Sequence, residues 1–445
     1  MTRPLITLLL VSLAVGFLLF TIPHHRSPPM SHETQLTSGA GGRILTNTGV
    51  WSANSQWIVY DTRSDAAGEQ FDGKRIEMVN VVTKEIRIVY EAKNGAHCGV
   101  ATWHPTEPKV IFILGPEHPT SDWLYSACHR QGVIVDVQNP GMAINLDARD
   151  LTPVFTMGAL RGGSHVHVYS PDASLVSFTY EDHLLSKFTT PNEHHDLNQR
   201  NIGVSVIGKP VTVPKSHPRN QDGAAFTVLI TQTTANPRSS SDDISKAFEE
   251  AWVGHRSLAF QGLVRTATNE PISEVFIVDL PEDLTQPGDG PLQGTTTRRP
   301  SPPRGTMQRR LTNTTSHHFP GLSGPRHWLR TAHDASRIGF LKRDELGVVQ
   351  FWTISPQGGE PVQVTHNHHP VASAFTWHPT DNSVAFVMDN SVCVTDVTTG
   401  ATRRITPRSE DSPRPEACVF SSDGKHIAFV RRIAEVNQIC VVVVD

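Results

Sequence analysis

The chain has 445 residues, a net charge of -4 at pH 7 and 38% hydrophobic residues. This composition describes an ordinary globular protein with enough length to bury a large core. Basic residues gather only between Arg298 and Arg310, among Pro and Thr in an expected loop, with no basic stripe beside them. We therefore expect no nucleic-acid partner, since such proteins concentrate Lys and Arg on one face.

The N-terminus carries a targeting segment. Arg3 is followed by an uncharged apolar run of 18 residues, Leu5 to Ile22, whose length lies between a long signal peptide and a membrane anchor. We predict a signal peptide or anchor over residues 1–26, a linker over 27–33 and a working domain over 34–445. The domain is then exported, and is either periplasmic or membrane-anchored with its face away from the cytoplasm.

Beyond the linker one theme recurs, an aromatic residue, a tight turn and two β-rich runs. The turns use Pro, Asp, Asn or Gly, and β-branched and aromatic residues suited to strands flank them. Six copies are clear: "VWSANSQWIVYD" from Val50, "TWHPTEPKVIFIL" from Thr102, "VYSPDASLVSFTY" from Val168, "RTAHDASRIGFLKRD" from Arg330, "TWHPTDNSVAFVMD" from Thr376 and "VFSSDGKHIAFVRR" from Val419.

Each repeat accommodates four strands, which predicts an all-β, seven-bladed β-propeller. The seventh unit lies between the third and fourth copies, where strands are expected at Ala225, Ser257 and Glu274. A polar segment and a short helix from Ser241 interrupt this unit, because two Asp residues there suit a helix N-terminus.

The ends of the chain predict how the ring closes. The last unit ends with "QICVVVV" and lacks an outer strand, whereas "TQLTS" from Thr34 precedes the first unit and matches the outer strands of the others. We predict that this N-terminal strand completes the last blade, beside Cys440, which also removes a free sheet edge.

Several motifs resemble a known family. The "SPD" and "SSDG" turns are similar to TolB-type propeller repeats, and "RILTNTGVWSANSQWIVYD", "GAHCGVATWHP", "LRGGSHVHVYSPD", "PGLSGPRHWLR" and "ISPQGGEPVQVTHN" resemble the uncharacterised YidR-type family of TolB-related propellers. The resemblance extends from about Gln35 to the end of the chain. The leader lies outside it, so the family implies nothing about localisation.

A second resemblance concerns chemistry. The segment Trp103 to Tyr125 is similar to part of the oligogalacturonate lyases. That resemblance implies a seven-bladed propeller whose central pocket holds a divalent metal with histidines, where a base removes a proton next to a sugar carboxylate.

Histidines recur at one repeat position. Four residues before the aromatic residue of each unit stand Asn47, Gly99, His165, His327, Ser373 and Glu416. Equivalent positions point toward one axis, so His165 and His327 are expected to converge. His167 follows by the two-residue strand period, and His97 lies near its own blade entrance. With Glu416 as a further ligand, these imidazoles suit Mn, Fe or Zn. The alternative for His165 and His167 is a pair of hydrogen-bonded core imidazoles.

Two arginines adjoin these positions. Arg161 and Arg326 either clamp a ligand carboxylate through bidentate hydrogen bonds or pair with a carboxylate of their own blade. No catalytic residue is assigned. The predicted function is a ligand-binding, partner-binding or scaffold module that acts through its channel mouth, on an envelope protein or a carbohydrate-like ligand. The alternative is a metal-dependent enzyme, a lyase of uronate-containing oligosaccharides.

The targeting prediction can be tested with a reporter fused after Ser38. A run of 18 apolar residues spans about 27 Å as a helix at about 1.5 Å per residue, close to the thickness of a membrane core. The reporter should be exported with Leu5–Ile22 present and stay cytoplasmic after its deletion. A cytoplasmic reporter on the complete leader would contradict the prediction.

Overall fold

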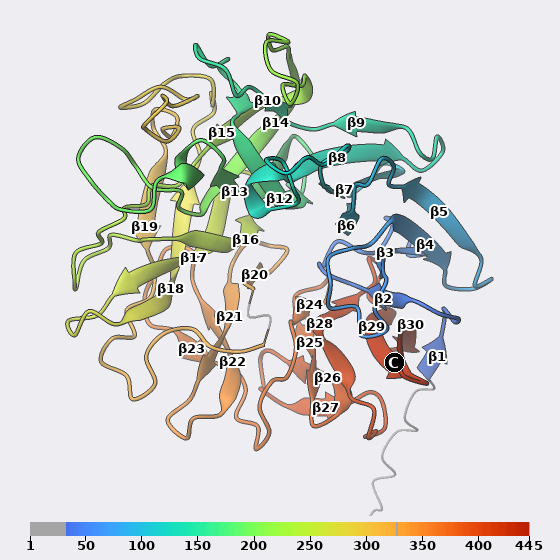
Figure 1. Cartoon of the computed structure of the whole chain (residues 1–445). Coiled ribbons are helices and arrows are strands. Elements are labelled where there is room, and N and C mark those ends of the chain that lie inside the picture. The colour runs from blue at the N-terminus through green and yellow to red at the C-terminus, as the bar shows by residue number, and fades with distance from the viewer. Residues whose placement is uncertain (1–32, 326–327, 445) are drawn as a thin grey trace, which may run out of the picture.

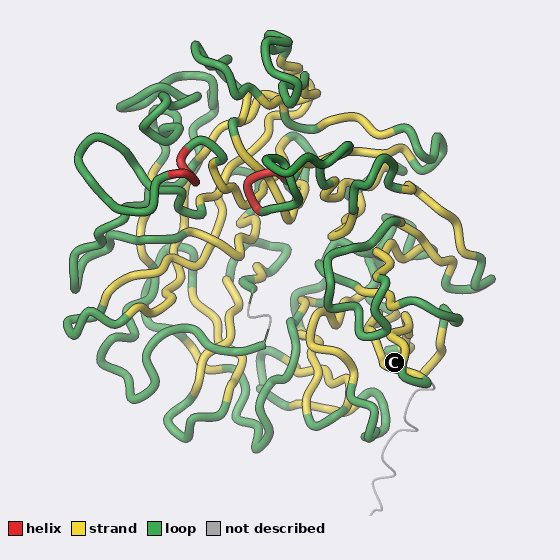
Figure 2. The backbone as a smooth tube through the Cα atoms, viewed as in Figure 1, coloured by secondary structure: helices red, strands yellow, loops and turns green. Residues whose placement is uncertain are grey.

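The computed structural model describes residues 33–325 and 328–444, which form a ring of β-sheets around a common axis (Figure 1). Within these residues the chain forms seven four-stranded sheets and one two-stranded sheet. Helix is confined there to two short 3-10 turns, η1 (Ala127–His129) and η2 (Leu185–Lys187), drawn red in Figure 2. The predicted all-β, seven-bladed propeller is confirmed.

Each four-stranded sheet is one blade. The strand named first for each blade below is the one nearest the axis. Blade 1 comprises β2 (Gly42–Ile44), β3 (Trp57–Arg63), β4 (Arg75–Asn80) and β5 (Ile86–Glu91). Blade 2 comprises β6 (Cys98–Trp103), β7 (Lys109–Leu114), β8 (Gln131–Asp136) and β9 (Ala143–Asn145). Blade 3 comprises β12 (Gly162–Tyr169), β13 (Leu175–Asp182), β14 (Asn201–Val211) and β15 (Gly223–Leu229).

The remaining blades follow the same order. Blade 4 comprises β16 (Ala247–Val253), β17 (Ser257–Arg265), β18 (Pro271–Asp279) and β19 (Met307–Arg310). Blade 5 comprises β20 (Arg330–Thr331), β21 (Ile338–Arg343), β22 (Val349–Ile354) and β23 (Val362–Gln363). Blade 6 comprises β24 (Thr376–Trp377), β25 (Ser383–Met388), β26 (Ser391–Asp396) and β27 (Thr402–Arg404), and blade 7 comprises β28 (Pro413–Phe420), β29 (His426–Ile433), β30 (Val436–Val443) and β1 (Glu33–Gln35). The two-stranded sheet pairs β10 (Ala148–Arg149) with β11 (Ala159–Leu160).

The hydrophobic core lies between the blades. Middle strands are apolar on both faces because each blade is covered by a neighbour on either side. Ile202 and Val204 of β14, for example, belong to one buried cluster with Phe260 of β17 and Phe276 of β18. Burial of such side chains contributes about 1.5 to 3 kcal/mol each, so the stacked blades stabilise one another.

The sequence-based assignment of the region around Ser241 is wrong. The expected helix is instead a turn followed by β16, which is the innermost strand of blade 4. The strand expected at Ala225 is β15, and it closes blade 3 rather than opening the next blade. The cause is tertiary: the slot nearest the axis in blade 4 requires a strand, and pairing with β17 outweighs the local helix-capping pattern.

The predicted closure of the ring is confirmed. β1 pairs antiparallel with β30, with Gln35 opposite Cys440. Beyond β1, the backbone N–H of Leu36 donates to the Ile439 carbonyl at 2.8 Å, and the Ile439 N–H donates to Thr37 Oγ1 at 2.9 Å. The chain therefore enters the propeller at the outer edge of blade 7.

The targeting segment Leu5–Ile22 lies outside the described residues. Within residues 33–325 and 328–444, no helix has the length and apolar character needed to cross a bilayer.

The ion pair that clamps β1 offers a test of the closure. Arg431 of β29 donates to both carboxylate oxygens of Glu33 at 2.7 Å, and its side chain is 7% exposed. Glu33→Gln leaves this guanidinium without its counter-charge, so the free energy of unfolding should fall by about 2 kcal/mol in a denaturant titration.

Glu435→Gln is the matched control. Glu435 pairs with Arg432 at 2.9 Å, but its side chain is 87% exposed, and solvent screens such pairs. Its stability should equal that of the wild type. Equal stability of both variants would contradict a clamping role for Glu33.

Candidate functional site

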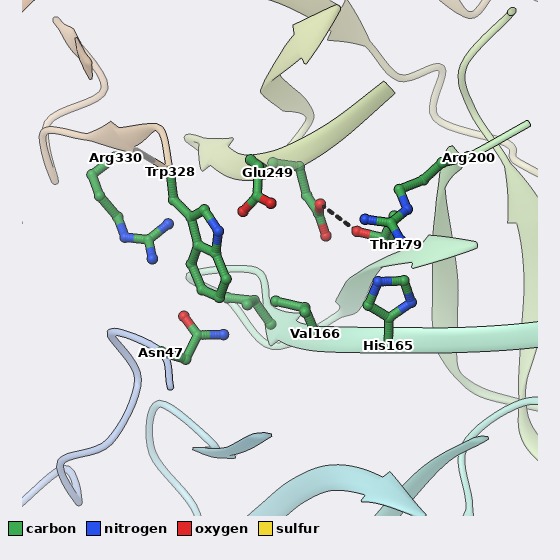
Figure 3. A pocket seen from close by; sticks show the side chains of 10 residues that line it. Asn47, His165, Val166, Thr179, Arg200, Glu249, Trp328 and Arg330 are labelled. Carbon is green, nitrogen blue, oxygen red and sulfur yellow. Dashed lines mark hydrogen bonds between the residues drawn. The ribbon is translucent and has the colours of Figure 1, made fainter. Parts of the chain in front are cut away.

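Two adjacent cavities lie on the propeller axis, where the innermost strands meet. The smaller has a volume of about 20 Å³ and the larger about 220 Å³. They share three lining residues, His165, Val166 and Trp328. Figure 3 shows the smaller cavity, with the Trp328 indole between Asn47 and Glu249. We call the two spaces together the central channel.

A β-bulge in each of three successive blades shapes this channel. In β12, His165 pairs with Thr179 and Val168 with Ser177, so three steps along β12 match two along β13. β6 and β16 contain the same irregularity, between Gly99 and Thr102 and between Phe248 and Ala251. Bulges of this kind change the direction of a side chain.

The bulged residues are strained and face the channel. Val100, Val166 and Glu249 have φ values of 60°, 60° and 58° and stand three residues before the aromatic residue of their blades. A left-handed conformation costs about 1 to 2 kcal/mol in a residue other than glycine. All three side chains line the channel, so the strained backbone conformation occurs where each blade places a side chain at the axis.

The bulge separates the two histidines that the strand period placed on one face. His165 lines both cavities, whereas the ring of His167 lies between blades 2 and 3, where its Nε2 is 3.1 Å from Ser164 Oγ. A side chain at Gly132 of β8 would collide with this ring. The expected shared face is therefore wrong, because the extra residue in β12 reverses the alternation after His165.

The other predicted metal ligands are placed as follows. His97 lies beside the larger cavity, where its Nδ1 is 3.2 Å from the Phe71 carbonyl oxygen and its ring is 6.4 Å from that of Tyr125. His327 lies outside the described residues. In the described part of the chain, no group of three or more His, Cys, Asp or Glu residues is arranged to hold a metal ion. The described residues alone therefore do not form a metal site. The predicted metal site that includes His327 remains a prediction.

The predicted ligand-binding residues Arg161, Arg326 and Glu416 have the following surroundings. Arg161 is buried, and its Nε donates to Asp182 at 2.8 Å, which is the pairing with a blade carboxylate that we considered as the alternative. Arg326 lies outside the described residues. Glu416 is buried and accepts a hydrogen bond from Arg414 at 3.0 Å. Neither Arg161 nor Glu416 lines the channel cavities.

The repeat alignment nevertheless found part of the site. Asn47 and His165, at the same repeat position, both line the smaller cavity. Glu249 and Glu250 were missed because their segment was assigned to a helix. The pattern that identifies them is Trp252, whose indole donates to the Val168 carbonyl at 3.0 Å and is the aromatic anchor of blade 4.

Arg130, Arg330 and Trp328 were missed for another reason. Arg130 follows η1, far in sequence from any repeat anchor, and Arg330 and Trp328 lie at the start of blade 5. Arg130 lies in a loop that no sequence period marks. Trp328 and Arg330 stand three residues and one residue before Thr331, which takes the place of the aromatic residue in blade 5, so the repeat alignment could have identified them.

Burial determines the protonation of the channel groups. It lowers the pKa of His165 well below its usual value, and the charges of Arg130 and Arg200 act in the same direction. It also raises the pKa of Glu250 to about 7, with the neighbouring carboxylate of Glu249 adding to the rise. At neutral pH the imidazole is therefore uncharged, and Glu250 is partly protonated.

Several channel atoms have unused hydrogen-bonding capacity. Within residues 33–325 and 328–444, buried Asn47 Nδ2, His165 Nδ1, Glu250 Oε1 and Arg330 Nε have no hydrogen-bond partner. Buried polar groups in folded proteins almost always have one. These four atoms belong to residues that line one small cavity, an arrangement that suits a polar ligand.

Known proteins resemble this chain to different degrees. A family model described as "Protein of unknown function (DUF3748)" matches residues 97–221. A solved structure of an oligogalacturonate lyase in complex with manganese matches with a TM-score of 0.56 at 9% identity, and the match covers 94% of each chain. The structure of a putative TolB from Agrobacterium tumefaciens matches with a TM-score of 0.41 at 12% identity, and the match covers 83% of this chain and 98% of the TolB chain. At such identities, the likeness to the lyase shows the fold alone.

One relative is much more similar in sequence. The "Uncharacterized protein YidR" of Escherichia coli (strain K12) is 45% identical over 400 residues, which cover 89% of this chain and 94% of that protein. Identity at this level over nearly the whole length is shared only by members of one family. The chain therefore belongs to the YidR family of β-propeller proteins.

Proposed function

We propose that this protein is an exported β-propeller that binds a small, anionic, carbohydrate-like ligand in its central channel. The observation that carries the proposal is the guanidinium of Arg130 in the wall of the larger cavity, beside stacked aromatic rings and without a carboxylate partner among the described residues. Export is supported by the apolar run Leu5–Ile22.

Arg130 differs from the neighbouring arginines because no carboxylate pairs with its charge among the described residues. Arg63, in the same cavity, pairs with Asp61 at 2.5 Å, and Arg200, in the smaller cavity, pairs with Glu181 at 2.7 Å. Arg130 instead donates from Nε to Tyr125 Oη at 2.9 Å. A cation that no described protein carboxylate neutralises attracts an anionic ligand, and its planar fork suits a carboxylate.

The aromatic residues indicate a ligand with an apolar face. The rings of Phe71 and Tyr125 stack with centroids 4.8 Å apart at 14°, and both line the larger cavity together with Trp328. Ring faces beside a few polar groups are typical of small-molecule sites. A sugar acid combines these features, since its ring has an apolar face, hydroxyl groups and one carboxylate.

The proposal predicts selective binding of a sugar acid. Isothermal titration calorimetry should detect D-galacturonate, whereas D-galactose, which lacks the carboxylate, should bind at least about tenfold more weakly. Arg130→Gln should reduce the affinity for D-galacturonate by at least about tenfold, since a hydrogen bond to a charged group contributes about 1.5 to 3 kcal/mol.

Arg256→Gln is the control for this experiment. Arg256 pairs with Glu282 at 2.9 Å on the surface and lines neither cavity. Its affinity should equal that of the wild type. Equal affinity for both sugars, or no detectable binding of either, would contradict the proposal. Release of an unsaturated uronate from oligogalacturonate would instead support the alternative, a lyase, and metal content with and without His165→Ala would then test the predicted metal.

A further inference from the structure

The smaller cavity contains buried donors that lack acceptors. The Asn47 side-chain oxygen accepts the Thr48 N–H at 2.7 Å, which fixes the orientation of the amide and leaves Nδ2 without a partner in the described part of the chain. Arg330 Nε is buried and equally unpaired there. Two donors that line one cavity and lack acceptors indicate that a ligand presents an oxygen to them.

Glu250 is the third polar group of this cavity. The Thr179 hydroxyl donates to Glu250 Oε2 at 3.1 Å, the contact drawn as a dashed line in Figure 3. Oε1 is buried and has no partner among the described residues. Glu250 is 6% exposed, so bulk solvent does not reach this oxygen. A protonated Oε1 would be a further donor directed at the same ligand oxygen.

Four charged or titratable residues of the described chain line the smaller cavity together with Glu250. Glu249 lies on the same strand, Arg330 on β20 and His165 on β12. Arg200, the residue before β14, is already paired with Glu181.

Burial and the negative charge of Glu249 raise the pKa of Glu250, whereas the hydrogen bond from Thr179 and the charge of Arg330 lower it. No ion pair within 4.0 Å involves Glu250 in the described residues. Burial is the largest of these effects, so the protonated carboxyl group is favoured.

We propose that the smaller cavity is an oxygen-binding subsite, in which protonated Glu250 donates a hydrogen bond to a ligand oxygen that Asn47 and Arg330 also bind. The inference rests on the proposed function and adds a property to it, because ligand binding then takes up one proton. That proton passes from solvent to Glu250 Oε1, and no bond of the ligand is broken. The ligand accordingly presents a hydroxyl or carbonyl oxygen here, while its carboxylate lies beside Arg130 in the larger cavity.

Calorimetry with D-galacturonate between pH 6 and pH 9 tests the subsite. The carboxylate of this probe is ionised throughout the range, so the probe itself adds no pH dependence. Wild-type affinity should decrease about tenfold per pH unit above about pH 7, the slope expected for one linked proton. Glu250→Gln carries a permanent N–H donor and should keep its affinity within about twofold over the whole range.

Glu249→Gln is the matched control, since it removes the same charge from the same cavity. It should retain the wild-type slope with a midpoint at lower pH, because a negative neighbour of Glu250 is gone. Folding is checked by thermal unfolding at pH 8. A buried carboxyl group with a raised pKa makes the folded protein less stable as pH rises through that pKa. Because Gln does not ionise, Glu250→Gln should unfold at the wild-type temperature or above it.

Three other outcomes would contradict either the subsite or the proposed function. A pH-independent wild-type affinity would overturn the subsite and leave the proposed function intact. Loss of binding in a stably folded Glu250→Gln at every pH would also overturn it, because the ionised carboxylate would then be the required group. Absence of wild-type binding at pH 6 would overturn the proposed function and, with it, this inference.

Discussion

The bulge in the innermost strands is the constraint on which the channel depends. Three residues, Val100, Val166 and Glu249, adopt a left-handed backbone conformation that side chains of this kind rarely take. Each bulge turns one side chain toward the axis and reverses the alternation of the residues after it. The same device therefore presents Glu249 and His165 to the channel and sends His167 into a blade interface.

Hydrogen bonds between neighbouring blades hold these strands in place. The indole N–H groups of Trp51, Trp252 and Trp377 donate to carbonyl oxygens of the preceding blade's innermost strand, at 3.1, 3.0 and 3.0 Å. In the opposite direction, the Thr102 hydroxyl of blade 2 donates to the His167 carbonyl of blade 3 at 2.8 Å. Because each anchor bridges two blades, the bulges are stabilised by the closed ring and not by one sheet alone.

Some buried polar groups of the propeller are fully paired, whereas several at the channel keep an unpartnered atom in the described part of the chain. Arg161 is buried against Asp182, and Glu274 accepts the Thr314 N–H at 2.7 Å, so these groups are satisfied and structural. Around the channel, Asn47, His165 and Glu250 each keep an unpartnered buried atom within the described residues. Buried groups of the second kind reduce stability, and proteins retain them chiefly where a ligand supplies the missing contact.

The sequence by itself determined the repeat, the number of blades and the closure of the ring, because strand period, turn residues and the missing outer strand after Cys440 are local or additive features. It also placed Asn47 and His165 at the axis through their shared repeat position. Only the tertiary structure decided the rest. The bulge in β12 separated His167 from His165, the axial slot of blade 4 made Glu250 part of a strand, and the loop that contains η1 brought Arg130 to the channel. Such placements depend on contacts between residues far apart in the chain, which no sequence period encodes.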